Sequence, residues 1–397
     1  MLKLNFIFEN KFKLNQIFLK LLLLFSFIAI SINFFEWTEK KSYYEYSDWL
    51  INYQGGFTRR GLFGEILYIF HEASGLGLDL ILYLSVILMY FVFFLFLYRI
   101  LKQSNLNFLN TLILFSPLSF IYLAFNKTLA GRKEILLFFL LVIFFYNLNK
   151  IKFENIKYWI ILILTVSSLT HFGFIFYSPF LILFFIFLYP EKKFKELFIQ
   201  ISPILFSGLL IVLFTLYSTI YSKPEIFEIC ASIKDFVKNC PSETYVRVLN
   251  YSISDIRAIN ISFAGNYYFV KYPIYFILSF TPITIALINL RNNKNYKIKK
   301  LFIFLSISLI CTIPVFYLGA DYGRYLNWQY MFVLLIYLHL INFKFLKQDN
   351  KNYFFDSKIP KQMLYIIIFL YGFTWSVPHC CDKNYSFLYD KLISIIF

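Results

Sequence analysis

The amino-acid sequence predicts an all-α, polytopic integral membrane protein with about 11 transmembrane helices, outer-face loops and an interfacial amphipathic helix. The chain has 397 residues, of which 59% are hydrophobic and only 15% charged, whereas soluble domains are about 45–50% apolar and about 25% charged. Apolar runs close to the roughly 20 residues that cross a bilayer recur along its whole length. These observations exclude a soluble enzyme, a disordered chain and a secreted disulfide scaffold, and they predict one transmembrane domain, residues 1–397.

Eleven apolar runs are the candidate spans. They lie near residues 16–35, 77–98, 108–125, 135–149, 158–171, 173–189, 199–221, 268–290, 301–319, 328–343 and 363–378. The stretch 158–189 is too long for one crossing, has polar residues near its middle and is flanked by lysines on both sides. The positive-inside rule places both flanks in the cytoplasm, so we predict two short helices that turn at His171 on the outer side. The first run exceeds the apolar region of a signal peptide, so we expect it to remain as a span.

The net charge of +16 follows this topology. With the N-terminus in the cytoplasm, eleven crossings place the C-terminus outside. The inner segments then hold 22 Lys and Arg against 6 Asp and Glu, and the outer segments hold 16 against 16. The whole positive excess is therefore cytoplasmic, as the positive-inside rule requires. We interpret it as a topology signal, so membrane lipid is an expected partner and nucleic acid is excluded.

Two outer segments are long: a first outer loop at residues 36–76 and a large outer loop at residues 222–267. In the first loop, Asp48 is followed by a glycine-containing stretch that carries Arg59 and Arg60. Beyond it, Leu62, Ile66, Ile69 and Phe70 recur at helical spacing and predict an amphipathic helix that lies in the membrane interface. The two arginines either bind an anionic ligand or extend to lipid phosphates.

Charged residues also mark two short outer turns. Arg132 and Lys133 precede a predicted helix, where cations oppose the helix dipole. A bound anion would explain them, and so would an ion pair with Glu134 or another carboxylate. Asp321 and Arg324 are three residues apart in the second turn. They either pair with each other or bind a ligand, and both can hold because a carboxylate often positions an arginine for a phosphate.

Four further residues are candidates. His171 lies at the hairpin apex, where it is either functional or closes a helix end by hydrogen bonds. Arg257 belongs to the large outer loop and is a weaker substrate-binding candidate. Cys230 and Cys240 lie ten residues apart in the same loop, where a disulfide is plausible. We predict no metal and no cofactor, because the adjacent cysteines at 380 and 381 with one histidine fall short of a usual ligand set.

Arginines and lysines from separate outer turns would suit a phosphate or diphosphate whose lipid tail lies in the bilayer. Arginine binds phosphate oxygens bidentately, and each charge-assisted hydrogen bond contributes roughly 1.5–3 kcal/mol. An outer base, His171 or Asp48, would deprotonate an acceptor hydroxyl, an effect of about 10²–10⁴-fold. Together these features predict glycosyl transfer from a polyprenyl-linked donor on the outer face.

The segment Gly131-Arg132-Lys133-Glu134, a basic inner turn and Ser168-Leu169-Thr170-His171 together resemble the EpsG/Wzy-type polysaccharide polymerases. In those proteins an arginine opens the span and a histidine follows at the end of the next helix; Arg324 is similar to a late arginine of the family. The resemblance covers roughly residues 108–345, and this chain departs from it at Phe172. It implies a polymerase of undecaprenyl-diphosphate-linked repeat units in the bacterial inner membrane, acting in O-antigen or capsule synthesis with other polysaccharide-assembly proteins.

Two alternatives remain. The chain also resembles GT-C-type glycosyltransferases, which use a polyprenyl-phosphate sugar and carry an acidic residue in the first outer loop, where Asp48 or Glu36 would serve. A transporter or flippase of lipid-linked oligosaccharide ranks third. It predicts ionisable residues at mid-membrane and inverted repeats, whereas few charges lie inside the predicted spans and no repeat is visible.

Overall fold

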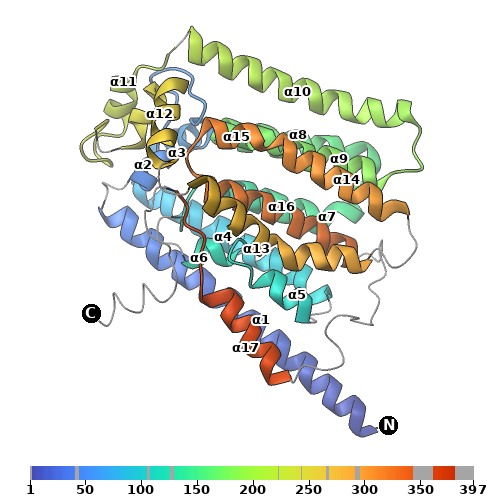
Figure 1. Ribbon diagram of the computed structural model, residues 1–397. Coiled ribbons are helices and arrows are strands. Elements are labelled where there is room, and N and C mark those ends of the chain that lie inside the picture. Colours follow the sequence, from blue (N-terminus) through green and yellow to red (C-terminus); the bar gives the residue numbers. More distant parts are fainter. Residues whose placement is uncertain are drawn as a thin grey trace.

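A computed structural model describes residues 2–40, 44–104, 108–125, 129–221, 223–242, 244–264, 268–290, 296–342 and 361–380. Within these residues every regular element is a helix. Long helices run side by side and form a bundle, and short helices cover one end of it (Figure 1). The all-α prediction is therefore confirmed for the described part of the chain.

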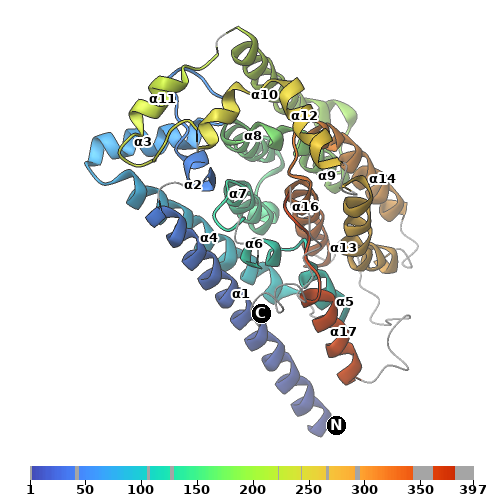
Figure 2. The ribbon, with the colours of Figure 1, turned by 60° about the vertical axis from the view of Figure 1, so that its left-hand side comes forward.

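Two helices form the centre of the bundle. α16 (Tyr322–Asn342) is buried from Tyr322 to Leu340, and α7 (Glu134–Asn147) buries most of its apolar residues. Figure 2 shows them between α1 (Leu2–Lys40) and α4 (Leu78–Gln103) on one side and α13 (Tyr268–Leu290) and α14 (Tyr296–Cys311) on the other. The first turns of α7 and α16 thus hold their charged side chains inside the protein.

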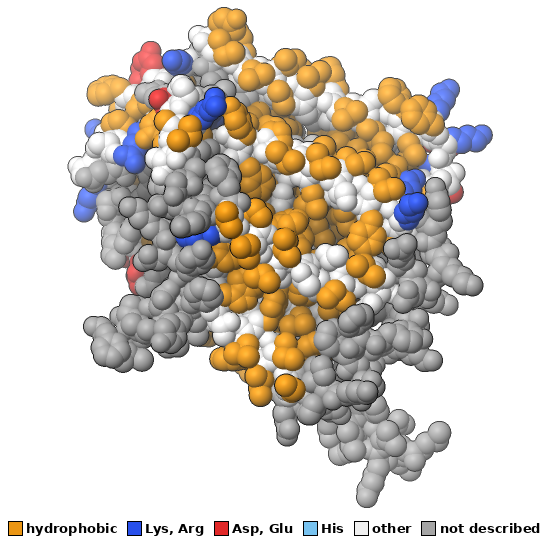
Figure 3. Space-filling model, viewed as in Figure 1, with side chains coloured by type: hydrophobic (Ala, Val, Ile, Leu, Met, Phe, Trp, Pro, Cys, Tyr) orange, Lys and Arg blue, Asp and Glu red, His pale blue; other side chains and the backbone are white. Residues whose placement is uncertain are grey.

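Five helices in the described residues are long and apolar enough to cross a membrane. They cover Leu19–Glu39, Leu78–Gln103, Phe194–Ser218, Val270–Asn289 and Ile298–Leu318. Each coincides with a predicted span, and a shorter apolar helix covers Phe172–Leu188. On the face shown in Figure 3, apolar side chains form a broad band between two ends that carry Lys and Arg. The molecule is thus a helical membrane protein.

The candidate span at residues 108–125 is not one continuous helix. The structure has α5 (Phe108–Leu114) and α6 (Ile121–Phe125), with an irregular stretch between them. Pro117 disfavours a helical conformation at the residue before it. Two serines of this stretch bind backbone carbonyl groups: Ser119 Oγ donates to Leu114 O of α5 at 2.6 Å, and Ser116 Oγ donates to Ser279 O of α13 at 3.2 Å.

The hairpin at His171 consists of α8 (Phe153–Thr170), the 3₁₀ helix η2 (Phe172–Tyr177) and α9 (Ser178–Leu188). His171 is extended, with φ −154° and ψ 103°, and this conformation ends α8. The bundle also includes α10 (Phe194–Ile220), the short α15 (Ile313–Leu318) and α17 (Lys361–Phe373). Pro314 at the start of α15 accompanies a break between α14 and α15 at Thr312.

Short helices gather at the end that the topology predicts to be outside. They are α2 (Tyr44–Trp49), α3 (Leu62–Ser74), α11 (Ile226–Ser232), η3 (Tyr245–Asn250) and α12 (Ile253–Ala264), at the left of Figure 1. In α3, Leu67 is buried whereas Ile66, Ile69 and Phe70 are exposed. The apolar stripe of α3 therefore faces away from the protein, as an interfacial helix requires.

Candidate functional site

A buried cluster of charged side chains lies beneath the short outer helices, and Asp48 on α2 is at its centre. α2 is fixed from two sides. Trp49 Nε1 donates to Gly131 O at 2.5 Å, and the Tyr245 N–H donates to Ser47 Oγ at 2.9 Å. Asp48 is only 1% exposed. The first outer loop, the turn before α7 and the large outer loop therefore hold Asp48 together, although they are remote in sequence.

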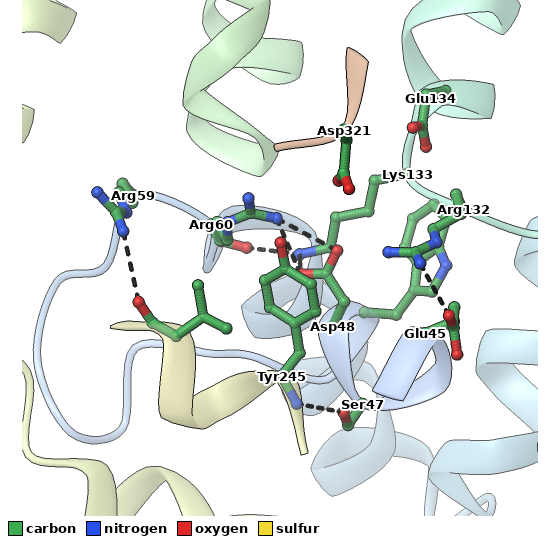
Figure 4. A network of polar contacts seen from close by, with 12 residues as sticks. Glu45, Ser47, Asp48, Arg59, Arg60, Arg132, Lys133, Glu134, Tyr245 and Asp321 are labelled. Carbon is green, nitrogen blue, oxygen red and sulfur yellow. Dashed lines mark hydrogen bonds and ion pairs between the residues drawn. The ribbon is translucent and has the colours of Figure 1, made fainter. Parts of the chain in front are cut away.

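Lys133 and Arg60 meet the Asp48 carboxylate (Figure 4). Lys133 Nζ lies 3.3 Å from Asp48 Oδ1, and Arg60 Nη1 lies 3.4 Å from Asp48 Oδ2. Lys133 also donates to Arg60 O at 2.9 Å, and the Arg60 guanidinium lies 4.5 Å from the centroid of the Tyr245 ring. Arg60 thus points into the protein, toward the Asp48 carboxylate.

Arg324, in the first turn of α16, lies between two carboxylates. Its Nε donates to Glu134 Oε1 and its Nη1 donates to Asp321 Oδ2. The i,i+3 pair proposed from the sequence is therefore present, and Glu134 is a second partner. Arg132 Nη2 donates to Glu45 Oε1 at 2.8 Å. Arg324 is 1% exposed, so these contacts are shielded from solvent.

His171 is buried at the end of α8. Its backbone N–H donates to Ser167 O at 2.7 Å. The ring centroid lies 5.3 Å from that of Trp328 and 5.0 Å from that of Phe174. A Cβ at Gly173 would lie 3.2 Å from ring atoms of His171. The aromatic side chains and this glycine fix the imidazole against α16, close to Arg324.

The charges around Asp48 keep it ionised. Burial alone would raise its pKa, but the positive charges of Lys133, Arg60, Arg132 and Arg324 outweigh burial and hold the pKa below its ordinary value. Burial lowers the pKa of Lys133 to about 8, although Asp48 opposes this change. Asp48 is therefore a carboxylate at neutral pH, and Lys133 is a cation that titrates just above it.

His171 is neutral. Burial, with the positive charges of Arg60, Arg324 and Lys133, holds the pKa of its imidazole well below the ordinary value. The same cations act on Asp48 and on His171, which shows that the predicted outer segments converge on one region. Convergence of Arg60, Arg132, Lys133, Asp321 and Arg324 is the arrangement that a shared ligand site requires.

The cluster divides into parts of different formal charge. Asp48 with Lys133 and Arg60 has two cations and one carboxylate, a net charge of +1. Arg324 with Glu134 and Asp321 has one cation and two carboxylates, a net charge of −1. The Arg132–Glu45 pair is neutral. The three groups together therefore have no net charge, although the Asp48 group and the neighbouring Arg324 group have charges of opposite sign.

Several buried polar atoms of the cluster have no hydrogen-bond partner among the described residues. They are Glu134 Oε2, Ser168 Oγ, His171 Nδ1, Arg324 Nη2 and Trp328 Nε1. All five side chains are 6% exposed or less. Buried polar groups are normally paired within the protein or by ligand or water, so these atoms are free to bind a polar ligand.

Two predicted substrate-binding arginines lie outside the cluster. Arg59 Nη2 donates to Val248 O at 3.5 Å and points away from the Asp48 carboxylate in Figure 4. Arg257 is exposed on α12. In contrast, sequence reasoning did not identify Tyr245 or Trp328 as site residues, and it considered Glu134 only as an ion-pair partner. The position of Glu134 directly after Arg132 and Lys133 in the sequence was the one indication that it lies near the cluster.

Cys230, Cys240 and Cys380 are all disulfide-bonded. Cys230 and Cys240 form a disulfide with their Cα atoms 5.6 Å apart, and it closes a loop of the large outer segment. Asp321, His379 and Cys380 bring possible ligand atoms within 4.8 Å of one another. The Cys380 sulfur is already in a disulfide, and the Asp321 carboxylate accepts a hydrogen bond from Arg324. These residues therefore do not fit a thiolate metal site.

In comparisons with known protein families, curated proteins and solved structures, the chain has no match.

Proposed function

We propose that this protein is a membrane glycosyltransferase that polymerises undecaprenyl-diphosphate-linked oligosaccharide repeat units in O-antigen or capsular polysaccharide synthesis. The reaction takes place on the outer face of the bacterial inner membrane. The proposal includes eleven spans with a cytoplasmic N-terminus and a periplasmic C-terminus. One observation carries it: cations from three remote segments, Arg60, Arg132, Lys133 and Arg324, meet in one buried cluster at the predicted outer end.

Stability alone is a poor reason to keep such a cluster. Replacing a buried ion pair by well-packed apolar residues is often neutral or stabilising, because ions lose much of their hydration on burial. This chain has apolar residues in abundance and yet keeps Arg324 and Lys133 almost fully buried. The cluster also includes unpaired polar atoms. Binding of a charged ligand accounts for both features.

A lipid-linked diphosphate fits this arrangement chemically. Lys133 and Arg60 form the positive part of the cluster and would bind diphosphate oxygens. The exposed apolar stripe of α3, a helix that begins two residues after Arg60, would lie in the interface and suits the lipid portion. As an acceptor hydroxyl attacks the anomeric carbon, the bond to the diphosphate breaks, and these cations stabilise the leaving group.

The test is the glycan ladder of a deletion strain complemented with wild-type protein or variants. Arg132→Ala and His171→Ala should fail to restore chain length, leaving single repeat units. Arg257→Ala is the matched control because Arg257 is exposed on α12, and it should restore the ladder. A ladder of unchanged length in the deletion strain would contradict a polymerase, and unchanged glycans throughout would favour the transporter.

A second candidate is a GT-C-type glycosyltransferase that uses a polyprenyl-phosphate sugar. The observation that favours it is Asp48, an acidic side chain of the first outer loop that lies on α2 shortly after α1 and at the centre of the cluster. The same ladder separates the two candidates. A single-sugar transferase leaves the ladder length unchanged and alters its sugar content.

A further inference from the structure

We infer that Glu134 is the catalytic base for the acceptor hydroxyl, in a subsite that it shares with Trp328 and His171. The inference rests on the proposed function and adds a residue to it. The subsite comprises the negative part of the cluster, around Arg324. The positive part, around Lys133, is left to the diphosphate.

The first argument is the availability of a carboxylate oxygen. Glu134 Oε1 accepts from Arg324 Nε, whereas Oε2 has no hydrogen-bond partner in the part of the chain that the structure describes. Asp48 differs, because Lys133 and Arg60 approach its two oxygens. A base must reach the proton that it removes. Glu134 has an oxygen for that proton, while the oxygens of Asp48 already have cationic partners.

The second argument is charge. The group of Arg324, Glu134 and Asp321 has a net charge of −1, which disfavours a diphosphate. It admits a neutral hydroxyl more readily than an anion, and it stabilises the positive charge that develops at the anomeric carbon during glycosyl transfer. The +1 charge of Asp48, Lys133 and Arg60 favours the anion. The two parts of one cluster thus suit the two partners of one reaction.

The third argument is the chemistry of the surrounding side chains. Trp328 Nε1 and Arg324 Nη2 are unpaired donors, and His171 Nδ1 is a further unpaired atom. The Trp328 ring lies 5.3 Å from that of His171, and 5.8 Å from the Arg324 guanidinium. Unpaired donors beside the unpaired Glu134 Oε2 suit a sugar, which presents several hydroxyl groups.

The proposed step is balanced. Glu134 Oε2 takes the proton of the acceptor hydroxyl, and the hydroxyl oxygen forms a bond to the anomeric carbon of the donor sugar. The bond from that carbon to the diphosphate oxygen breaks, and its electron pair leaves with the diphosphate. Lys133 and Arg60 hold the diphosphate, and Arg324 keeps the Glu134 carboxylate in position through Oε1.

The experiment compares Glu134→Gln with Glu65→Gln by two readouts. Glu65 is the control on α3: its carboxylate accepts hydrogen bonds at both oxygens, from the Tyr53 N–H at 2.8 Å and the Gln54 amide at 3.1 Å, and it lies outside the cluster. Transfer is measured as the glycan ladder of the complemented deletion strain. Binding is measured with farnesyl diphosphate and the purified full-length protein in lipid nanodiscs.

We expect Glu134→Gln to reduce ladder extension by at least about 100-fold while farnesyl diphosphate binding stays within about threefold of wild type. Glu65→Gln should match wild type in both. Ladder extension by Glu134→Gln within threefold of wild type would overturn the inference and leave the proposed function standing. If wild-type protein neither binds the probe nor restores a ladder, the proposed function itself fails.

If the Glu134→Gln variant does not fold, Glu134→Asp provides a second test of the inference. It keeps the charge and the ion pair but withdraws the carboxylate by one methylene group. We expect extension to fall at least about tenfold with unchanged farnesyl diphosphate binding, because proton transfer depends closely on position. Wild-type extension by Glu134→Asp would overturn the inference independently.

Discussion

Lys133 is a fully buried cation of the cluster. Its ammonium group is 0% exposed and lies between the Asp48 carboxylate and the Arg60 carbonyl oxygen. Burial lowers its pKa to about 8, while the Asp48 charge limits the fall. A lysine with this pKa is charged at neutral pH and loses its proton within an accessible range, so its role can be tested by pH.

We expect the affinity of the purified protein for farnesyl diphosphate to fall as pH rises through about 8. Below that pH Lys133 is protonated and attracts the anion. Above it the charge is lost, and affinity should fall by up to about tenfold per pH unit for one linked proton. Binding isotherms between pH 6.5 and 9.5 measure this dependence. Lys133→Arg should abolish the alkaline fall, because arginine stays charged; the same fall in Lys133→Arg would contradict this role.

Arg324 makes a separate prediction about stability. It pairs with Glu134 and Asp321 at the start of the buried helix α16. Arg324→Ala leaves these carboxylates without their common partner, and breaking a buried pair on one side destabilises by about 3–5 kcal/mol. Thermal unfolding of the detergent-purified protein should therefore shift clearly downward. An unchanged melting temperature would show that these ion pairs contribute nothing to the fold.

At the residue level, the sequence identified most charged residues of the cluster but not the directions in which their side chains point. Arg132, Lys133 and Arg324 are predictable because the positive-inside rule makes cations unusual at the outer ends of spans, and Asp48 is predictable as an acidic residue of the first outer loop. Arg59 and Arg60 are neighbours of one type, and only the backbone path decides that Arg60 meets Asp48 while Arg59 meets Val248. Trp328 and Tyr245 have no sequence signal among so many aromatic residues, because their roles follow from tertiary contacts.

Among the elements, α3 is held close to α2 by a glycine. A Cβ at Gly64 would overlap the Ile51 carbonyl oxygen and lie 2.8 Å from the Trp49 carbonyl oxygen. Both obstacles are backbone atoms, so a side chain at this position must push α3 away from α2. Since Asp48 lies on α2 next to Trp49, this contact supports the cluster.

We therefore expect Gly64→Ala to destabilise the protein by about 1–3 kcal/mol, the usual effect of overpacking, and to reduce glycan extension. Gly208→Ala is the control: Gly208 lies inside α10, and its Cβ would meet only Ile175 Cδ1 at 3.7 Å. There alanine should be neutral or stabilising by up to about 1 kcal/mol through helix propensity. Equal melting temperatures for the two variants would refute the close α2–α3 contact.

The elements also show where hydropathy fails as a predictor. It located the five long apolar helices, because their length and composition are sufficient. It joined α5 and α6 into one span, although Pro117 and two serines lie between them. The serine hydroxyls bind backbone carbonyls, and one of these belongs to α13, so a tertiary contact stabilises the break.

For the whole molecule, composition and hydropathy were enough to predict a helical membrane protein, while convergence of remote segments was an assumption. Asp48 and Arg324 are far apart in sequence, and no local pattern joins them. They meet because α2 and the first turn of α16 lie at the same end of the bundle and the large outer loop covers that end (Figure 1). Only the packing of the helices specifies this meeting.

Membrane orientation is a prediction at the same scale. Alkaline phosphatase fused after residue 76 or residue 258 should be active, because both positions lie in predicted outer segments. Fusion after residue 193 should be inactive, since lysines mark it as cytoplasmic. Green fluorescent protein fusions should give the reverse pattern. Phosphatase activity after residue 193 would invert the orientation and place the cluster in the cytoplasm.

The most direct test of the central claim, that the buried cluster binds a lipid-linked diphosphate, is a cryo-electron microscopy structure of the full-length protein in nanodiscs with farnesyl diphosphate. We predict phosphate density within hydrogen-bonding distance of Lys133 Nζ and the Arg60 guanidinium, with the prenyl chain leading toward α3. Diphosphate density elsewhere on the protein, or an unoccupied cluster at saturating farnesyl diphosphate, would contradict the claim.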